Sequence, residues 1–478
     1  MSERENPKCK AGLFGIGLDT YWGQFPGLRE RLLGYQARIY DAISSDGCEV
    51  RDAGLVDSPE KARAAAEFLK REDIDLLFLF VATYALSSTV LPVLQKTKVP
   101  LVILNLQPVA AIDYESFNAL RDRGTMTGEW LAHCQACSVP EIANVCNLAG
   151  IGYDFVTGWL DDPEAQAAIR EWAKAARIVR AMRESRVGIL GHYYGGMLDV
   201  YTDLPRQQAV FGTHFEILEM CEIKSLRDAI GEDDVARKIR EFSASFEVSP
   251  ECSAFEIERA ARTSCALDAL TRKHRLGALA YYYEGSPGND YENIVTSVIA
   301  GNSLLTAKGI PVAGECEVKN AQAMKIMSLA GAGGSFSEFY AMDFPADLIL
   351  LGHDGPAHAA IAEGPVALVP LPVYHGKPGE GLSIQMRVKE GPVTLLSVID
   401  RGAGGIAFLV AEGETVSGPT LQIGNTNSRY RFSLGAKAFI EAWSRAGPSH
   451  HCAVGTGHIA SLLGKVASIL GIDCLRIC

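Results

Sequence analysis

The sequence lacks an excess of basic residues. It has 45 Lys and Arg against 57 Asp and Glu, which gives a formal net charge of -12. Binding to nucleic acid requires a stripe of Lys and Arg that neutralises several phosphates, and no segment of the sequence carries one. An anionic membrane surface disfavours an acidic protein for the same reason. The composition therefore argues against nucleic acid and membranes as partners.

Long hydrophobic runs are also missing. The longest apolar stretch, LLFLFVATYAL at residues 76–86, is too short to span a bilayer and reads as a buried strand. The first ten residues, MSERENPKCK, carry several charges where a signal peptide needs an apolar segment. We therefore expect a cytoplasmic protein without membrane spans.

Cysteine is too sparse and scattered for a disulfide scaffold, with 12 cysteines in 478 residues. A chain of this length builds its core without disulfides, so we expect reduced thiols. HCQAC at residues 133–137 contains one CxxC pair, but no second CxxC accompanies it. We interpret this pair as two half-buried thiols on a helix, in preference to a zinc or redox site.

The common nucleotide and hydrolase motifs are absent as well. GIGLDT places Gly15 and Gly17 after an apolar run, but Thr20 stands where the dinucleotide fingerprint has its third glycine. The sequence contains neither a GxxxxGKS/T phosphate loop nor a GxSxG nucleophile elbow. Nucleotide binding and α/β-hydrolase chemistry are therefore disfavoured.

What the sequence does contain is a regular alternation of apolar runs and amphipathic helical stretches. This alternation is typical of parallel α/β sheets, and it restarts at RVGILGHYYGGM, residues 186–197. Later in the chain, short apolar runs separated by Gly, Pro and charge are typical of antiparallel hairpins. The predicted fold is two doubly wound parallel-sheet α/β domains, residues 1–182 and 183–330, followed by a β-rich, barrel-like C-terminal domain, residues 331–478.

Four stretches combine carboxylates or histidines with unusual surroundings. Glu315 follows a short apolar run and a glycine, where a strand end faces a crevice. Glu338 lies in the aromatic-flanked GGSFSEFY, where an isolated carboxylate is costly. His353 ends the apolar run LILLGH, and His450 and His451 lie in GPSHHCAVGTGH, which we interpret as a loop. Each residue alone also has an ordinary structural explanation.

Taken together, these stretches resemble one family. AGECEVK, GSFSEFY, LLGH and the PSHH stretch follow one another in the order and approximate spacing of the metal-binding motifs of the L-arabinose isomerase family, within the arabinose and fucose isomerase superfamily. GIGLDTYWGQFPGL, the segment around HCQACSVPE and ILGHYYGGMLDVYTD also look like counterparts of family segments. The resemblance covers essentially the whole chain, and the family's three-domain plan agrees with the fold predicted above.

The resemblance implies a metal site of two carboxylates and two imidazoles. The family's ligands fall on Glu315, Glu338, His353 and His451, which would hold a divalent ion, most often Mn(II), with Co(II) or Mg(II) as alternatives. Glu315 and Glu338 are also the expected catalytic acid/base pair. The expected substrate contacts are His133, Tyr21, Trp22, His450, Met197 and Lys319.

The chemistry agrees with this composition. Mixed carboxylate and imidazole ligands suit Mn(II) and leave positions for two substrate oxygens. We therefore predict a divalent-metal-dependent aldose–ketose isomerase that acts on a sugar, an L-arabinose-like pentose, a hexose or a derivative, through a cis-enediol. The resemblance also implies a homo-oligomer, trimeric or hexameric, in which His133 approaches the active site of a neighbouring subunit.

Departures from the family leave alternatives open. Cys316, Glu317 and Val318 replace the family's Gly-Asp-Trp, and the family's N-terminal signature is absent. These changes fall near the expected substrate pocket. A metal-dependent epimerase, decarboxylase or aldolase-type lyase acting on a related sugar or sugar acid is one alternative. A non-catalytic sugar-binding protein is the second.

Overall fold

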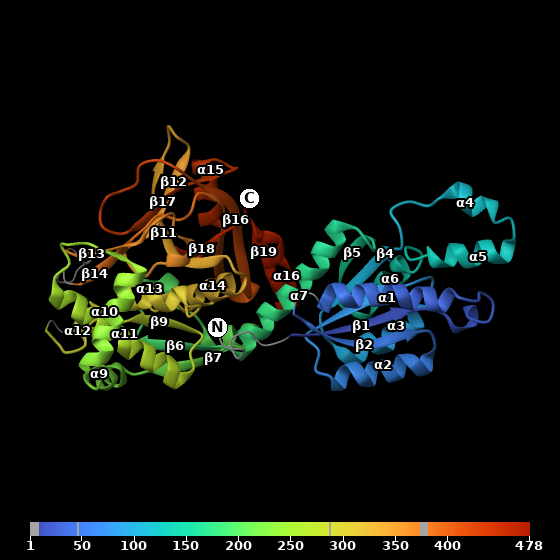
Figure 1. The fold of residues 1–478 in the computed structure, drawn as a ribbon, viewed down its shortest axis with the longest axis horizontal. Helices are drawn as coiled ribbons and strands as arrows, with labels where there is room; N and C mark the ends of the chain where they lie inside the picture. Colours follow the sequence, from blue (N-terminus) through green and yellow to red (C-terminus); the bar gives the residue numbers. More distant parts are fainter. Residues whose placement is uncertain (1–8, 45–46, 286–287, 373–380) are drawn as a thin grey trace. The chain divides into compact units, whose positions relative to one another are not determined.

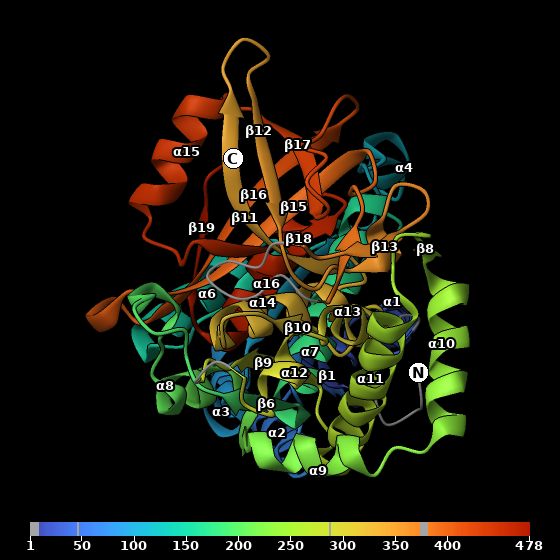
Figure 2. The ribbon, with the colours of Figure 1, turned by 90° about the vertical axis from the view of Figure 1, so that its left-hand side faces the viewer.

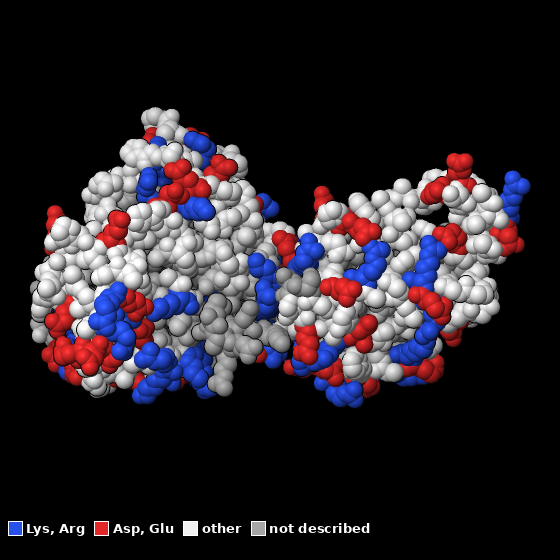
Figure 3. Space-filling model, in the orientation of Figure 1, with Lys and Arg blue, Asp and Glu red and all other residues white. Residues whose placement is uncertain are grey.

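The computed structural model describes residues 9–44, 47–285, 288–372 and 381–478. The chain forms two compact units, the first ending at Arg180 and the second beginning at Ala181 (Figure 1). On the face shown in Figure 3, Lys and Arg side chains are interspersed with Asp and Glu. Within the described ranges, no helix combines the length and the apolar character that crossing a membrane requires.

The first unit is built on a five-stranded parallel sheet in the order β2-β1-β3-β4-β5. All six residues of the central strand β3 are buried, as expected for a strand that is covered on both faces. Ser58 begins the second helix by accepting a hydrogen bond from the backbone N–H of Lys61 at 3.3 Å. The elements are β1 (Lys10–Ile16), η2 (Asp19–Tyr21), α1 (Leu28–Ser44), β2 (Glu49–Val56), α2 (Pro59–Arg71), β3 (Leu76–Val81), α3 (Ser87–Thr97), β4 (Leu101–Gln107), α4 (Tyr114–Ala119), α5 (Arg123–Ala132), α6 (Val139–Ala149), β5 (Asp154–Trp159) and α7 (Pro163–Glu184).

Two expectations about cysteine are wrong in this unit. Cys9 and Cys48, each just before a strand, form a disulfide with their Cα atoms 5.1 Å apart, because the parallel pairing of β1 with β2 brings the two strand starts together. Cys134 and Cys137 lie in the turn between α5 and α6, not on a helix. Their Sγ atoms are 2.8 Å apart, with Cys134 buried and Cys137 exposed.

The second unit begins with a four-stranded parallel sheet in the order β10-β9-β6-β7. The sequence pattern predicts a single helix over residues 225–245, but the structure has two, because the backbone is extended at Gly231, immediately before the second helix. The elements are β6 (Arg186–Gly191), η3 (Leu198–Val200), α8 (Leu204–Phe211), β7 (His214–Leu218), α9 (Met220–Asp228), α10 (Glu232–Ser245), α11 (Ala254–His274), β9 (Ala278–Tyr282), α12 (Glu292–Val295), α13 (Ile299–Ala307), β10 (Val312–Ala313) and α14 (Val318–Leu329).

The same unit continues as a closed barrel. Its strands follow the order β15-β18-β11-β12-β17-β16, and β16 pairs with β15 to complete the ring. β19 adds to β16 in parallel, and a small sheet has the order β14-β13-β8. The elements are β8 (Glu247–Val248), β11 (Gly333–Asp343), β12 (Leu348–His353), η4 (Ala359–Ile361), β13 (Ala367–Pro370), β14 (Leu382–Gln385), β15 (Gly391–Asp400), η5 (Gly402–Gly404), β16 (Ile406–Val416), β17 (Thr426–Phe432), α15 (Ala436–Arg445), β18 (His451–Thr456), α16 (Ala460–Leu470) and β19 (Asp473–Arg476).

This architecture confirms the predicted fold class of parallel α/β sheets followed by a β-rich barrel. The histidine stretch is different from the prediction, because His451–Thr456 is a barrel strand and not a loop. Helix α14 contacts the barrel strands β11, β15 and β18 and also the parallel strands β9 and β10 (Figure 2). We propose that the central and C-terminal domains meet near residue 330, where α14 ends and β11 begins.

Candidate metal centre

Three neighbouring barrel strands bring distant parts of the sequence together. In the register of β11, Glu338 lies opposite His451 of β18 on one side and Gly352 of β12 on the other. His353 follows Gly352 directly as the last residue of β12. Phe336 and Glu338 are two residues apart on one strand, so they share a face. Hydrogen-bonded strand pairing therefore collects three of the expected ligands in one region.

Glu315 reaches the same region from the parallel sheet, two residues after β10 ends. Its φ is 55° and that of Cys316 is 59°, a left-handed conformation that costs about 1–2 kcal/mol per residue. Surrounding backbone hydrogen bonds hold this turn: the N–H of Cys316 donates to Tyr281 O at 2.9 Å, and that of Tyr194 donates to Glu315 O at 3.4 Å. Strained backbone of this kind is concentrated at functional sites.

The side chains converge around one carboxylate. Glu315 Oε2 lies 3.3 Å from Nε2 of His450 and 3.3 Å from Nε2 of His451. Glu315 Oε1 is 4.0 Å from His353 Nε2, and Glu338 Oε2 is 4.0 Å from His450 Nε2. One ligand atom each from Glu315, His450 and His451 lie within 4.8 Å of one another, a grouping able to hold a metal ion. The structure thus brings together the four expected ligands and His450.

Phe336 packs beneath the imidazoles. Its fully buried ring has its centroid 4.4 Å from that of His353 and 4.2 Å from that of His451. The rings of His450 and His451 are 3.8 Å apart by the same measure. This packing restricts the rotation of the imidazoles and excludes water from one side of the cluster.

Two carboxylates that were not predicted as functional residues hold the paired histidines. Glu317 Oε2 lies 2.6 Å from His451 Nδ1, and both side chains are buried. Asp199 Oδ2 lies 2.6 Å from His450 Nδ1 and also accepts a hydrogen bond from the His450 N–H at 3.0 Å. Lys319, buried in the first turn of α14, donates to the backbone oxygen of Asp199. Of these two carboxylates, only Glu317 could have been identified as a candidate from the sequence, because it lies two residues after Glu315.

The electrostatics of the cluster follow from these contacts. Burial lowers the pKa of His450, but hydrogen bonds and charge from Glu315 and Asp199 outweigh burial and raise this pKa to about 9. Burial raises the pKa of Asp199, but His450 reverses that effect and holds this pKa below its usual range. Burial raises the pKa of the Cys316 thiol to about 12, so Cys316 stays neutral near the cluster.

The donor atoms fit a divalent cation. His451 Nε2 is buried and makes no hydrogen bond, although it lies 3.3 Å from the buried Glu315 Oε2. The Nδ1–H of His451 donates to Glu317, which leaves the Nε2 lone pair directed at the cluster. Carboxylate oxygen and neutral imidazole nitrogen are ligands that Mn(II) accepts. A cation at this point satisfies both buried atoms.

The other expected substrate contacts are more dispersed. In the first unit, Tyr21 belongs to the short helix η2, and the indole N–H of Trp22 donates to Asp57 Oδ2 at 2.9 Å. His133 follows the last residue of α5 and is partly buried. In the second unit, Met197 precedes η3 and is half-buried. Their roles in binding substrate stay predictions.

The chain matches a family model described as L-fucose isomerase, C-terminal domain, over residues 354–477. It is similar to an L-arabinose isomerase of Nocardioides sp., with 24% identity over 70% of this chain and 68% of the relative. An L-arabinose isomerase of Vibrio parahaemolyticus is 23% identical over 90% of this chain and 87% of its own length. That of Bifidobacterium animalis subsp. lactis is 21% identical over 98% and 94%.

A solved response regulator/GGDEF domain protein aligns with 67% of this chain and 98% of its own, but at a TM-score of 0.23 and 10% identity it supports no inference. The likeness to the isomerases is different in kind, because it extends over almost the whole length of both chains. The chain is therefore similar to L-arabinose isomerases over almost its whole length, and its C-terminal part matches the model of the L-fucose isomerase C-terminal domain.

Proposed function

We propose that this protein is a divalent-metal-dependent aldose–ketose isomerase that acts on an L-arabinose-like pentose, a hexose or a related sugar. The observation that carries the proposal is the convergence of Glu315, His450 and His451, with His353 and Glu338 within 4.0 Å of members of this group. A sugar-binding protein without catalysis does not need two carboxylates beside a cation site.

The proposed ligands are Glu315, Glu338, His353 and His451, and Mn(II) is the cation that this donor set suits best, with Co(II) or Mg(II) as alternatives. When bound, the cation supplies Lewis-acid stabilisation of the negative charge that develops on the sugar oxygens. Glu317 contributes indirectly, because its hydrogen bond orients the imidazole of His451.

The proton transfer is assigned to the carboxylates. A C2–H bond is a weak acid, so its proton must pass to a positioned base and return at C1. Glu315 and Glu338 both approach His450 Nε2, at 3.3 and 4.0 Å. We assign these two carboxylates as the acid/base pair that carries the proton through a cis-enediol, without ordering the two. We assign His450, which lies beside both carboxylates, as a contact for a sugar oxygen.

We also propose that the protein is a homo-oligomer, trimeric or hexameric, in which His133 contributes to the site of a neighbouring subunit. The support is the resemblance of the segment around HCQACSVPE to the family, whose active sites are completed in this way. Sedimentation of the active enzyme tests this part. A monomer with full activity contradicts it.

The reaction is tested with a panel of aldoses in deuterated water. The purified, Mn-loaded protein is incubated with each sugar, and the products are followed by NMR. Deuterium at C1 of a ketose product supports the isomerase. Loss of a carbon, or retro-aldol fragments, contradicts it and favours a lyase. Binding of a sugar without any exchange contradicts catalysis altogether.

The site assignment is tested by variants that keep the size of each side chain. Glu315→Gln and Glu338→Gln remove one carboxylate each, and we expect turnover to fall by about 1,000-fold or more. Glu414→Gln is the matched control, because Glu414 lies exposed on the barrel strand β16. Wild-type turnover in either active-site variant rejects the assignment.

A further inference from the structure

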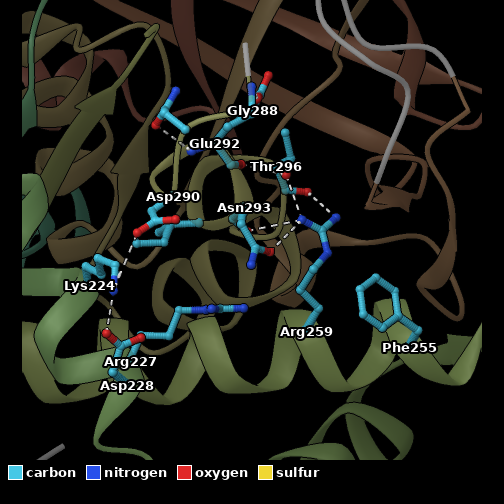
Figure 4. Close-up of a pocket in the computed structure, with 12 residues that line it drawn as sticks. Lys224, Arg227, Asp228, Phe255, Arg259, Gly288, Asp290, Glu292, Asn293 and Thr296 are labelled. Atoms are coloured by element: carbon cyan, nitrogen blue, oxygen red, sulfur yellow. Dashed lines mark hydrogen bonds and ion pairs between the residues drawn. The ribbon is translucent and has the colours of Figure 1, made fainter. Parts of the chain in front are cut away.

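A cavity lies in the second unit, and none of its lining residues belongs to the candidate metal centre. It has a volume of about 580 Å³ and is formed by α9, α11 and the segment that contains α12 (Figure 4). Cavities of this size hold small metabolites. Its walls carry three cationic side chains, Lys224, Arg227 and Arg259, so the question is which of them has a partner.

All three nitrogens of the Arg259 guanidinium donate hydrogen bonds. Its guanidinium donates to Glu256 Oε2 at 2.6 and 2.9 Å, to the oxygens of Asn293 and to Thr296 Oγ1 at 2.7 Å. Only 6% of its surface is exposed. Arg259 is therefore a fixed part of the cavity wall, with its charge compensated by Glu256.

Within the described residues, the side chain of Arg227 donates a hydrogen bond from one atom only. Its Nε donates to Thr263 Oγ1 at 2.8 Å, and within the described part of the chain no carboxylate lies within 4.0 Å of its guanidinium nitrogens. Burial lowers the pKa of Arg227, and the charges of Arg259 and Arg262 lower it further, while the charge of Asp228 offsets only part of this effect. A half-buried cation next to other cations is a costly arrangement that a bound anion relieves.

The acidic residues of the cavity contact lining residues other than Arg227. Asp228 Oδ2 accepts from Lys224 Nζ at 2.6 Å, and Asp290 lies 3.8 Å from the same nitrogen. Glu292 Oε2 accepts from the backbone N–H of Gly288 at 2.7 Å. Among the three lining cations, Arg227 is thus the one for which the described part of the chain provides no direct ion pair, and its guanidinium extends below Asn293 toward Arg259 in Figure 4.

We propose that this cavity binds the phosphate group of a small phosphorylated metabolite, with Arg227 as the principal phosphate ligand. The planar guanidinium donates two parallel hydrogen bonds to phosphate oxygens, which suits it to this role better than an ammonium. The side chain of Phe255, 68% exposed at the cavity wall, offers an apolar surface for the carbon part of the metabolite. The site is separate from the candidate metal centre and does not depend on the proposed reaction.

The proposal is tested by calorimetric titration of the Mn-loaded protein with inorganic phosphate, glucose 6-phosphate and glucose. We expect both phosphates to bind and glucose not to bind. Tighter binding of glucose 6-phosphate identifies a phosphorylated metabolite as the ligand, and equal affinities identify inorganic phosphate, which overturns the role of Phe255. Absence of phosphate binding, or equal binding of glucose, overturns the proposal.

Variants separate this cavity from phosphate bound at the metal. Arg227→Gln should lower the affinity for inorganic phosphate and for glucose 6-phosphate by about tenfold or more and leave isomerase activity unchanged. Arg240→Gln is the matched control for charge, because Arg240 is exposed on α10. Phe255→Ala, which changes only an exposed side chain, should lower the affinity for glucose 6-phosphate and leave that for inorganic phosphate unchanged. Wild-type phosphate affinity in a folded Arg227→Gln protein contradicts the proposal.

Discussion

His451 and Glu317 form a buried pair at the edge of the candidate metal centre. Nδ1 of the histidine lies 2.6 Å from Oε2 of the glutamate, and their side chains are 0% and 1% exposed. The two residues are 134 positions apart in the sequence. His451 is the first residue of β18, and Glu317 directly precedes α14. A carboxylate that holds one imidazole nitrogen fixes the direction of the other, which is the arrangement found around metal-ligating histidines.

Glu317→Gln tests this relationship. The amide keeps the size of the side chain but loses the charge that holds the His451 Nδ1–H, so we expect the affinity for Mn(II) to fall by about 10–100-fold. Titration calorimetry with Mn(II) measures the effect. Glu414→Gln, on an exposed barrel position, serves as the control. Unchanged Mn(II) affinity in the Glu317 variant contradicts an orienting role.

Binding of Mn(II) should release protons. The pKa of His450 in the metal-free protein is raised to about 9, so this imidazole is protonated at neutral pH and its charge opposes a cation. We expect Mn(II) affinity to rise with pH up to about 9 and then to level off. Calorimetry in buffers of different ionisation enthalpy counts the released protons. Asp199→Asn should reduce this release, and a pH-independent affinity argues against the mechanism.

The same shift makes a prediction for the stability of the metal-free protein. Because the folded-state pKa of His450 lies above its ordinary value of 6.5, the pairing stabilises the fold fully below that value. The contribution is lost as the pH rises through about 9. Chemical denaturation of the wild type and of His450→Gln across this window should show converging stabilities at high pH. A difference in unfolding free energy that stays constant with pH argues against the raised pKa of His450.

Gly352 should not tolerate a side chain. A Cβ at this position would lie 2.2 Å from the backbone oxygen of Thr426 and 2.7 Å from Cβ of Asn427, so Gly352→Ala must push β12 away from β17. We expect a loss of about 3 kcal/mol in unfolding free energy, together with weaker Mn(II) binding through His353. Gly464→Ala, with open space around it in α16, should instead gain about 1 kcal/mol. Equal unfolding free energies of Gly352→Ala and the wild type contradict the register of β12 with β17.

The disulfide between Cys9 and Cys48 is testable by counting thiols. The protein denatured without reductant should expose ten free thiols, and twelve after reduction. Because the bridge closes a loop of 39 residues, Cys48→Ser should lower the unfolding free energy of the first unit by about 2–4 kcal/mol. Twelve thiols without reductant show that the pair is reduced.

Much of the fold was predictable because periodicity reports local burial. The apolar run of β3 and the alternation around it indicate a parallel sheet that the structure confirms. The strand pattern after residue 331 likewise indicates the barrel. β18 was not predicted as a strand, because glycine and histidine in GPSHHCAVGTGH are typical of loops. Its strand character arises from pairing with β11 and β15, which are distant in sequence.

The sequence by itself determined the chemical types and order of the cluster residues, because Glu315, Glu338, His353 and His451 stand in motifs that resemble those of one family. Only the tertiary structure decided which residues share the cluster and what holds them. Asp199 is 251 positions from His450, and no local pattern links the two. Strand register places Glu338 opposite His451, and a left-handed turn positions Glu315, because register and backbone strain depend on the whole fold.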